Sequence, residues 1–322
     1  MTLIVTGAAG FIGSSLCERL LARGEAVIGV DVFNAYYDPA LKEARVAKLM
    51  SHPKFRLVRA DIAEPEVLRS LVAEAEPRAL IHLAAQAGVR YSLDHPFAYE
   101  RANLAGHLAA LEACRHGKSR PHLIYASSSS VYGDRAASGG FSESDPAERP
   151  VSLYAATKRA AELMSEAYAP LYGLRATGLR FFTVYGPMGR PDMAYYSFTA
   201  KILAGEPLPV FGEGRMARDF TYIDDIIDGV IGVLDHPGRE GDHRLFNIGD
   251  SRPVGLLRMI EILEAAIGRR ADKHFHPMQP GDVTATFADI GRLHALCGYQ
   301  PKVPLEEGLP KFVAWYRAYH HI

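Results

Sequence analysis

Cysteine is scarce in this sequence, and the three that occur are not arranged for a shared function. Cys17, Cys114 and Cys297 lie far apart, without the close spacing of metal-binding cysteines. Three cysteines cannot all pair within one chain, and an odd number of scattered cysteines is typical of proteins from a reducing compartment. We therefore expect no disulfide framework and no bound metal.

The sequence also lacks long hydrophobic runs and an excess of charge of either sign. No apolar run approaches the roughly 20 residues of a membrane-spanning helix, and the first residues resemble a strand rather than a signal peptide. The 36 Lys and Arg residues nearly balance the 37 Asp and Glu residues, so net charge favours neither nucleic acid nor an anionic membrane as a partner. We expect a cytoplasmic globular protein whose 322 residues form one large or two fused domains.

Glycine, by contrast, is concentrated in a turn near the N-terminus. The β-branched, apolar run at residues 2–6 predicts a strand, and Gly7, Gly10 and Gly13 separate it from a helical pattern that begins at Ser14. Glycine lets the backbone approach a ligand closely, and the N-terminus of a helix attracts an anion. The turn therefore predicts a binding site for the pyrophosphate of a dinucleotide.

An acidic residue follows the second predicted strand, at residues 26–30. In a dinucleotide-binding fold, an acid in the position of Asp31 accepts hydrogen bonds from ribose hydroxyls. Its carboxylate would repel the additional phosphate of NADP, so we expect NAD. A plain turn followed by a solvated acid is the alternative, but it does not account for strand, helix and acid together. Phe11 and Ile12, which lie between the last two glycines, are included in the predicted NAD site.

Strands and helices alternate along the first two thirds of the chain. Further strands are predicted at residues 55–59, 79–83, 122–126, 174–182 and 243–248. The alternation predicts an α/β fold with a doubly wound parallel (Rossmann) sheet, in which ligands bind beyond the carboxyl ends of the strands. Asp61 and Ile62 follow the third strand, beside the expected adenine. Leu83, Ala84 and Ala85 end the fourth strand and permit close approach of the cofactor.

Three features in this part of the chain have two interpretations each. His82 has apolar neighbours and is better interpreted as a core histidine than as a base. Asn103 either caps a helix predicted at residues 104–114 or bonds to other neighbours. The basic helix predicted at residues 41–50 either lies beside the adenosine or presents a solvated face.

The composition changes after residue 182. Gly, Pro, Arg and aromatic residues dominate from 187 to 220, which indicates an excursion into a second, smaller α/β lobe. We predict a dinucleotide-binding domain at residues 1–182, to which 221–250 return, and a substrate-binding lobe made of 183–220 and 251–322.

Three arginines lie in the first part of this lobe. A guanidinium binds a pyrophosphate or a carboxylate through two parallel hydrogen bonds. We expect this of Arg190 and Arg218, and we interpret Arg215 as a surface residue.

A helix predicted to begin at Ser152 or Leu153 carries Tyr154 and Lys158. Residues four apart share one face of a helix, and an ammonium beside a phenol favours the phenolate. Without such help a phenol, which titrates near 10, is a poor base at neutral pH. The spacing alone is common, but here it follows the serines at 127–130 at the mouth of a dinucleotide fold. We therefore predict a catalytic pair.

Together these motifs resemble the extended short-chain dehydrogenase/reductase family of NAD-dependent nucleotide-sugar epimerases and dehydratases, over essentially the whole chain. The matching motifs are T-G-x-x-G-F-I-G at 6–13, H-L-A-A at 82–85, S-S-x-x-V-Y-G at 127–133, Y-x-x-x-K at 154–158 and R-D-F-x-Y-x-D-D at 218–225. Within the family, the segments at 87–92, 151–158 and 180–194 look like those of UDP-glucuronate 4-epimerases.

The resemblance implies a reaction and a set of catalytic roles. The reaction is NAD-dependent 4-epimerisation of UDP-glucuronate to UDP-galacturonate through a 4-keto intermediate. Ser128 would hydrogen-bond the reacting sugar oxygen and Tyr154 would be the base. Lys158 would lower the pKa of Tyr154 and bind the nicotinamide ribose. Relatives are commonly dimers through paired helices, so we expect a homodimer.

The resemblance also implies contacts to the nucleotide. Arg218 matches a ligand of the UDP phosphates, Phe211 a neighbour of the uracil and Asp282 a ligand of the uridine ribose. Arg90, in the matching segment at 87–92, is included among the substrate-binding residues.

Two differences from UDP-galactose 4-epimerases favour a uronate substrate. Those enzymes usually have Asn where this chain has Thr183 and Arg where it has Gln279. The smaller hydroxyl of Thr183, together with Arg190 and the hydroxyl of Ser129 or Ser130, would make room for a sugar carboxylate and bind it.

Three alternatives remain open. The first is a neutral-hexose 4-epimerase that acts on UDP-glucose and UDP-galactose. The second is a UDP-glucuronate decarboxylase or a 4,6-dehydratase, although such relatives usually have Asp or Glu where Ser129 and Ser130 stand. The third is a non-catalytic NAD-binding regulator, which the intact Ser-Tyr-Lys set disfavours.

Overall fold

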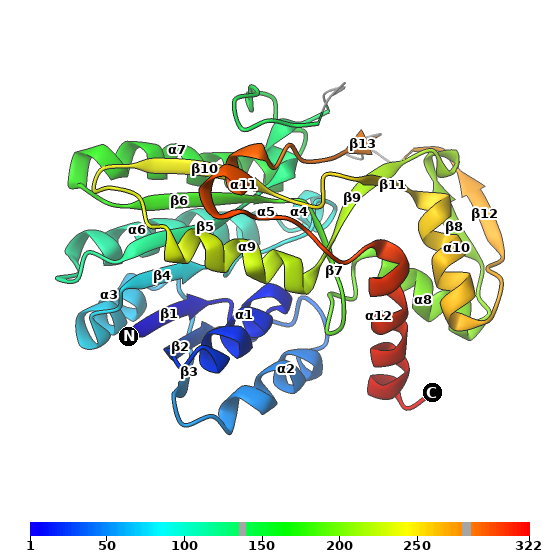
Figure 1. Ribbon diagram of the computed structural model, residues 1–322, viewed down its shortest axis with the longest axis horizontal. Coiled ribbons are helices and arrows are strands. Elements are labelled where there is room, and N and C mark those ends of the chain that lie inside the picture. The colour runs from blue at the N-terminus through cyan, green and yellow to red at the C-terminus, as the bar shows by residue number, and fades with distance from the viewer. Residues whose placement is uncertain (135–139, 279–284) are drawn as a thin grey trace.

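The centre of the molecule is a seven-stranded parallel sheet in the order β10-β6-β5-β4-β1-β2-β3 (Figure 1). The computed structural model describes residues 1–134, 140–278 and 285–322. The strands of this sheet are β1 Thr2–Thr6, β2 Ala26–Asp31, β3 Phe55–Arg59, β4 Ala79–His82, β5 His122–Ser128, β6 Ala176–Phe181 and β10 His243–Ile248. The sheet confirms the expected doubly wound α/β fold, and every predicted strand end lies within two residues of the observed one.

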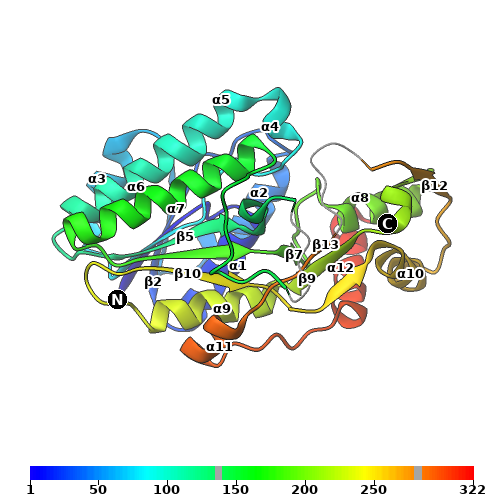
Figure 2. The same ribbon diagram turned by 90° about the horizontal axis from the view of Figure 1, so that it is seen from above.

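Helices cover both faces of the central sheet (Figure 2). One face carries α3 (Pro65–Ala75), α6 (Gly106–His116) and α7 (Leu153–Tyr172), and the other carries α1 (Phe11–Ala22), α2 (Ala40–Met50) and α9 (Ile223–Asp235). Successive side chains of a strand point to opposite faces, so Leu3 and Val5 enter one hydrophobic core and Ile4 enters the other. Burial of both faces explains why these strands are continuous apolar runs.

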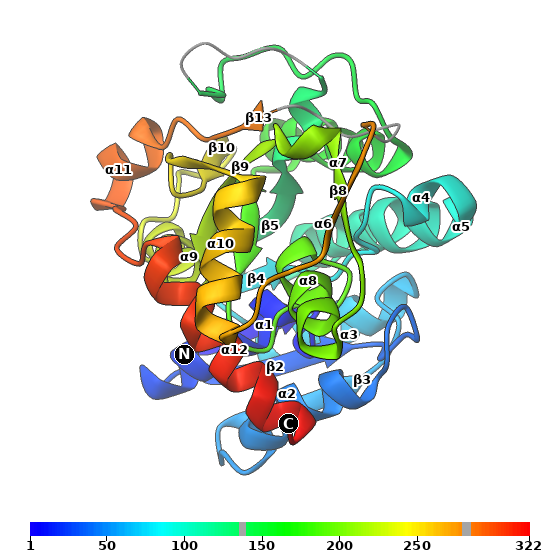
Figure 3. The ribbon, with the colours of Figure 1, turned by 90° about the vertical axis from the view of Figure 1, so that its right-hand side faces the viewer.

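A smaller lobe lies beyond the carboxyl ends of the central strands, with α8, α10 and α12 in the foreground of Figure 3. One small sheet contains β7 (Thr183–Tyr185), β9 (Ala217–Tyr222), β11 (Pro253–Gly255) and β13 (Ala285–Thr286), and a second contains β8 (Leu208–Phe211) and β12 (Lys273–His276). The helices of this lobe are α8 (Ala194–Ala204), α10 (Leu256–Ile267) and α12 (Leu305–His320), whereas α11 (Gly291–Cys297) packs against α9 and β10. The lobe therefore faces the edge of the sheet where ligands bind.

The segment before α6 differs from the prediction. Two short helices, α4 (Tyr91–Asp94) and α5 (Pro96–Tyr99), lead into a π-helix at Glu100–Ala105. Asn103 lies inside this π-helix rather than at a helix cap. Its side chain accepts a hydrogen bond from the Gln86 N–H at 2.8 Å and donates to Thr157 Oγ1 at 3.0 Å. Asn103 thus bonds to its neighbours, because the π-helix turns its amide toward the loop after β4 and toward α7.

The structure also decides between the interpretations of two other polar features. His82 is buried and its Nδ1 lies 2.9 Å from Thr6 Oγ1, and burial lowers its pKa to about 3, so it is a neutral core histidine. On α2, Lys42 and Arg45 are buried rather than solvated, and only Lys48 among the basic residues of that helix is exposed. Within the described residues, no helix is long and apolar enough to cross a membrane.

Gly13 offers a test of the packing of the glycine turn. A Cβ at this position would overlap the carbonyl oxygen of Gly7, which belongs to the backbone and cannot rotate away. We expect Gly13→Ala to lower the free energy of unfolding by about 1–3 kcal/mol, as overpacking commonly does. Urea denaturation measures the loss. Gly255→Ala is the control, because a Cβ there meets no atom within 4 Å. Equal stability of the two variants would contradict the packing described here.

Candidate active site

The glycine turn between β1 and α1 brings three backbone segments together. Gly7 donates its N–H to Val30 O at 2.8 Å and has a φ of +70°, a conformation that favours glycine. A Cβ on Gly7 would lie 2.8 Å from Ala84 N, so the missing side chain is what lets the turn approach the end of β4. Helix α1 begins at Phe11, earlier than predicted, because Gly13 belongs to its first turn. No side chain caps this helix, which leaves its N-terminus to an anion.

Asp31 connects the end of β2 to the glycine turn. Its Oδ2 accepts a hydrogen bond from Ala9 N–H at 3.0 Å, and its Oδ1 accepts one from Phe33 N–H at 2.9 Å. Lys42 Nζ lies 3.7 Å from Oδ1 and donates to Asn34 Oδ1 at 2.7 Å. The carboxylate is therefore held in place by backbone donors and balanced by one buried cation.

A cavity of about 270 Å³ runs from the glycine turn to the N-terminal end of α7. Its walls include each of the predicted cofactor-binding residues: Gly7, Gly10, Phe11, Ile12, Gly13, Asp31, Asp61, Ile62, Leu83, Ala84, Ala85, Tyr154 and Lys158. Ser128 and Arg190 lie on the same wall. The backbone cradle at the glycines and the acid at Asp31 fit a dinucleotide, with the predicted catalytic residues at the other end.

Tyr154 lies in the first turn of α7, whose N-cap Ser152 accepts a hydrogen bond from Ala155 N–H at 3.1 Å. Burial raises the pKa of the Tyr154 phenol. The Ser128 hydroxyl and the Arg190 guanidinium act in the opposite direction, and the Asp192 carboxylate adds to the increase. Four effects thus set the pKa of Tyr154: its burial, the Ser128 hydroxyl, the Arg190 cation and the Asp192 anion.

The ammonium group of Lys158 is bound to the end of the central sheet. Its Nζ donates to Ala126 O at 2.8 Å, at the end of β5, and burial lowers its pKa to about 8. In this arrangement Ser128 and Arg190 are the groups that lower the pKa of Tyr154. The role expected of Lys158 toward the phenol and the nicotinamide ribose stays a prediction.

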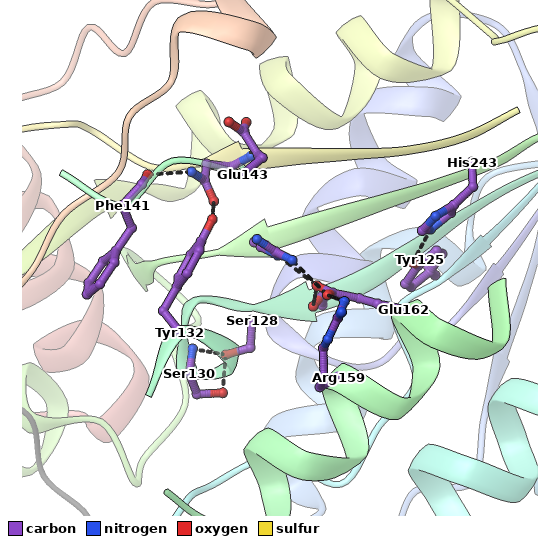
Figure 4. A network of polar contacts seen from close by, with 12 residues as sticks. Tyr125, Ser128, Ser130, Tyr132, Phe141, Glu143, Arg159, Glu162 and His243 are labelled. Carbon is purple, nitrogen blue, oxygen red and sulfur yellow. Dashed lines mark hydrogen bonds and ion pairs between the residues drawn. The ribbon is translucent and has the colours of Figure 1, made fainter. Parts of the chain in front are cut away.

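The side chains of Ser128 and Ser130 lie next to each other and have different hydrogen-bonding roles (Figure 4). Ser128 Oγ accepts hydrogen bonds from Ser130 N–H at 3.2 Å and from Ser130 Oγ at 2.9 Å. Because both donors belong to Ser130, the hydroxyl proton of Ser128 is left for Tyr154 or for a substrate oxygen. Ser129 and Ser130 begin a 3₁₀-helix at Ser129–Tyr132 and are half-buried beside Ser128.

A buried carboxylate holds the catalytic helix to the sheet. Glu162, on α7, is fully buried and accepts hydrogen bonds from Ser127 Oγ at 2.6 Å and from Arg159 at 2.9 Å. Arg180, on β6, donates to both of its oxygens at 2.8 Å. Burial alone would raise the pKa of Glu162, but the charge and hydrogen bonds of Arg180 keep it below its usual value.

The network continues from Arg180 to β10, and Figure 4 shows Tyr132 and Phe141 in this part of it. The Arg180 guanidinium lies 4.7 Å from the centre of the Tyr132 ring. Tyr132 donates its hydroxyl proton to Asn247 Oδ1 at 2.7 Å, and Asn247 Nδ2 donates to Phe141 O at 2.7 Å. The serine turn is therefore tied on one side to α7 and on the other to the strand that closes the sheet.

Arg190 does not present a free fork to the cavity. Its Nε and Nη2 donate to Oδ1 and Oδ2 of Asp192 at 3.0 and 2.6 Å. The expected two-bond grip on a substrate carboxylate is therefore already made by a residue of the chain itself. Arg190 still lines the cavity beside Tyr154, but a substrate has to share it with Asp192 or displace that residue.

A second hollow adjoins the first at Met193, which lines both. Its walls include Arg90, Thr183 and Arg218. Phe211 lies on β8, outside the lining of both cavities, with the Arg90 guanidinium 5.7 Å from its ring.

The other predicted residues are placed as follows. Arg215 is exposed, as predicted. Gln279 and Asp282 lie outside the described residues.

The sequence-based reasoning missed Glu162, Arg180 and Asp192. Glu162 had a usable signal, because it follows Lys158 by four residues and shares the face of α7 that carries the catalytic pair. Asp192 follows Arg190 by two residues, but a short loop gives no rule for which side chains meet. The partner of Arg180 was also hidden, since a buried arginine on a strand does not identify its acid from sequence.

Fold and site together define a dinucleotide-dependent enzyme of the extended short-chain dehydrogenase/reductase class. A model of the NAD dependent epimerase/dehydratase family matches residues 3–249. The chain therefore belongs to this family.

Individual relatives extend the match to the whole chain. UDP-glucuronate 4-epimerase 1 of Arabidopsis thaliana is 45% identical over 334 residues, which cover 99% of this chain and 77% of that protein. The crystal structure of UDP-glucuronic acid 4-epimerase from Bacillus cereus in complex with UDP-glucuronic acid and NAD has a TM-score of 0.93 at 36% identity, and covers 99% of this chain and 100% of that one. UDP-glucose 4-epimerase of Thermotoga maritima has a TM-score of 0.88 at 29% identity and the same coverage.

Tyr154 is the residue whose loss tests the site most directly. We expect Tyr154→Phe to reduce turnover at least ~10²-fold, the usual scale for loss of general acid–base help, because the variant keeps the ring and lacks the proton-transferring oxygen. Folding and NAD content should not change. Tyr172→Phe, at the other end of α7, is the matched control. Initial rates measure the effect, and normal turnover by Tyr154→Phe would exclude it as the base.

Proposed function

We propose that this protein catalyses the reversible 4-epimerisation of UDP-glucuronate to UDP-galacturonate with bound NAD. The observation that carries the proposal is that the residues expected to bind the dinucleotide line the same cavity as Ser128, Tyr154 and Arg190. The relatives named UDP-glucuronate 4-epimerase support the choice of sugar. The adjoining hollow with Arg90 and Arg218 supplies cations for the UDP phosphates.

In this mechanism the chain's own residues move one proton and hold one oxygen. NAD held at the glycine turn and Asp31 would supply the acceptor and donor of the hydride at carbon 4 of the sugar. Tyr154 removes the proton of the 4-hydroxyl and gives it back after the sugar has turned over. Ser128, whose oxygen already accepts two hydrogen bonds, donates to the same sugar oxygen. Lys158 holds the ribose next to the nicotinamide.

A uronate makes a particular demand on the site. Oxidation at carbon 4 creates a β-keto acid, which loses carbon dioxide when its carboxylate bond aligns with the carbonyl π system. An epimerase must therefore bind the carboxylate and keep it out of that alignment. We expect Thr183, Arg190 and the hydroxyls of Ser129 and Ser130 to supply donors to the carboxylate, without an acid that would protonate the decarboxylating carbon.

The alternatives are less well supported. A decarboxylase or dehydratase would gain from an acid at Ser129 or Ser130, and two carboxylates of the site are already engaged by arginines, the buried Glu162 by Arg180 and the partly exposed Asp192 by Arg190. A neutral-hexose epimerase remains the closest competitor, because a UDP-glucose 4-epimerase has the same fold. A non-catalytic role does not account for the Ser-Tyr-Lys set in the cavity.

The assembly and the division into lobes belong to the same proposal. Leu108 on α6 and Leu163 and Leu171 on α7 are exposed by 41%, 50% and 71%. A homodimer that packs these helices against their copies would bury them. We assign residues 1–182 and 221–250 to the NAD-binding domain, because β10 lies in the central sheet, and 183–220 with 251–322 to the UDP-sugar lobe. The free, mostly buried cysteines suit the cytoplasm.

Product analysis tests the proposal. Pure protein incubated with UDP-glucuronate should form UDP-galacturonate with no added NAD, and denaturation should release about one NAD per chain, because the cofactor is regenerated in each cycle. Chromatography and NMR identify the products. A UDP-pentose with carbon dioxide as the main product would favour the decarboxylase, and preferential turnover of UDP-glucose would favour the neutral-hexose enzyme.

Arg190 separates a uronate enzyme from a neutral-sugar one. We expect Arg190→Ala to weaken UDP-glucuronate binding by about 1.5–3 kcal/mol, the range for a hydrogen bond to a charged group, and to affect UDP-glucose much less. Calorimetry on both nucleotides measures the difference. Arg215→Ala, at an exposed arginine of the same lobe, is the control. Equal weakening of both nucleotides would make Arg190 a pyrophosphate or loop residue.

A further inference from the structure

We propose that Asp192 is a positioning residue for the epimerisation, acting through Arg190, with Tyr36 holding Asp192 in place. The inference rests on the proposed function and deepens it. It concerns three segments that meet beside Tyr154: the loop after β2, the loop after β4 and the loop after β7.

The contact between Arg190 and Asp192 defines the orientation of the guanidinium. Two parallel hydrogen bonds at 3.0 and 2.6 Å join Nε and Nη2 to the two carboxylate oxygens. This fork-to-fork geometry admits one arrangement of the planar group. Among the described residues no hydrogen bond engages Nη1. Asp192 therefore leaves one amino group of Arg190 to meet a substrate carboxylate from a defined direction.

Tyr36 fixes the other side of Asp192. Its hydroxyl donates to Asp192 Oδ2 at 3.1 Å. Its ring makes an edge contact with Tyr91, with centroids 4.7 Å apart. Gly88 has a φ of +99°, and a Cβ there would overlap the Tyr36 hydroxyl, so the loop after β4 leaves room for this tyrosine. Arg190 and Asp192 are two residues apart and can form an ion pair without a third group. The Tyr36 phenol, which comes from another loop, therefore fixes the position of Asp192.

The paired ions also act on Tyr154. The groups that act on its phenol are Ser128 from β5, Arg190 and Asp192 from the loop after β7, and Tyr99 from α5 with ring centroids 6.1 Å away. Lys158, one turn further along α7, lines the same cavity and donates to Ala126 O. Burial and the Ser128 hydroxyl have the largest effects on the pKa of Tyr154. The two ions come next and act in opposite directions, because Arg190 lowers this pKa and Asp192 raises it. Removal of the Asp192 charge should leave Arg190 unopposed.

The consequence for the reaction is a division of tasks. With Asp192 in its fork, Arg190 binds a uronate through one amino group and keeps the carboxylate in one orientation. Without Asp192, the whole fork can turn to the substrate, which strengthens binding of the ground state and loosens control of the carboxylate. Binding that does not favour the transition state lowers KM without raising kcat.

The test compares Asp192→Asn with the wild-type holoenzyme. We expect kcat with UDP-glucuronate to fall at least about fivefold while KM stays equal or falls. The ascending limb of the rate against pH, which reports formation of the Tyr154 phenolate, should move to lower pH by about half a unit or more, because the remaining charge lowers the pKa. A UDP-pentose should rise as a fraction of product. Tyr36→Phe should move each quantity in the same direction by a smaller amount.

Two further variants keep the test falsifiable. Asp192→Glu retains the charge and should keep the wild-type pH limb. Glu74→Gln removes a carboxylate from a two-bond arginine pair on the surface, with Arg56, and should change nothing. A merely structural role predicts instead a loss of bound NAD and a higher KM for UDP-glucuronate and UDP-glucose alike, with the pH limb unmoved, and that result would overturn the inference.

The outcome also distinguishes the two proposals. If the wild-type protein forms no UDP-galacturonate, the proposed function fails and the role of Asp192 fails with it. If the wild type epimerises UDP-glucuronate and Asp192→Asn keeps its kcat and pH profile, only the positioning role is overturned.

Discussion

The ion pair between Glu162 and Arg180 is the interaction on which the arrangement of the site depends. It joins α7, which carries Tyr154 and Lys158, to β6 at two hydrogen bonds of 2.8 Å in a position that water does not reach. A buried carboxylate costs several kcal/mol of desolvation unless hydrogen bonds satisfy it, and here Ser127 and Arg180 satisfy both oxygens. The catalytic helix therefore has one low-energy position against the sheet.

Hydrogen bonds and ring contacts continue from this ion pair on both of its sides. Ser127 on one side points to Glu162, so its neighbour Ser128 points to the opposite face of β5, into the cavity. On the other side, Arg180 covers Tyr132, which reaches Asn247 on β10. The Ser128 hydroxyl and the Tyr154 phenol, for which we propose roles in the reaction, are thus held in place by the same buried charges, although neither contacts them.

A second ion pair, between Arg190 and Asp192, serves a different purpose because it lies at the cavity wall. Its side chains are 27% and 29% exposed, whereas those of Arg180 and Glu162 are 2% and 0% exposed. A pair that is partly open to ligand can exchange partners at modest cost, whereas a fully buried pair cannot. The first pair therefore maintains the architecture, and the second lies at the cavity wall where we propose that the sugar carboxylate binds.

The sequence by itself determined the sheet, the glycine turn, Asp31 and the register of Tyr154 and Lys158, because these depend on local patterns: apolar runs, glycine spacing and the helical repeat. It did not determine the partner of Arg190, the environment of Tyr154 or the place of Asn103 within a π-helix. Those depend on which side chains from distant segments share a buried volume. Lys158 illustrates the limit: its spacing from Tyr154 was predicted correctly, but the carbonyl of Ala126, brought in by β5, decides where its ammonium points. Hydrogen-bond competition in a desolvated space is settled by tertiary packing, and no local pattern encodes it.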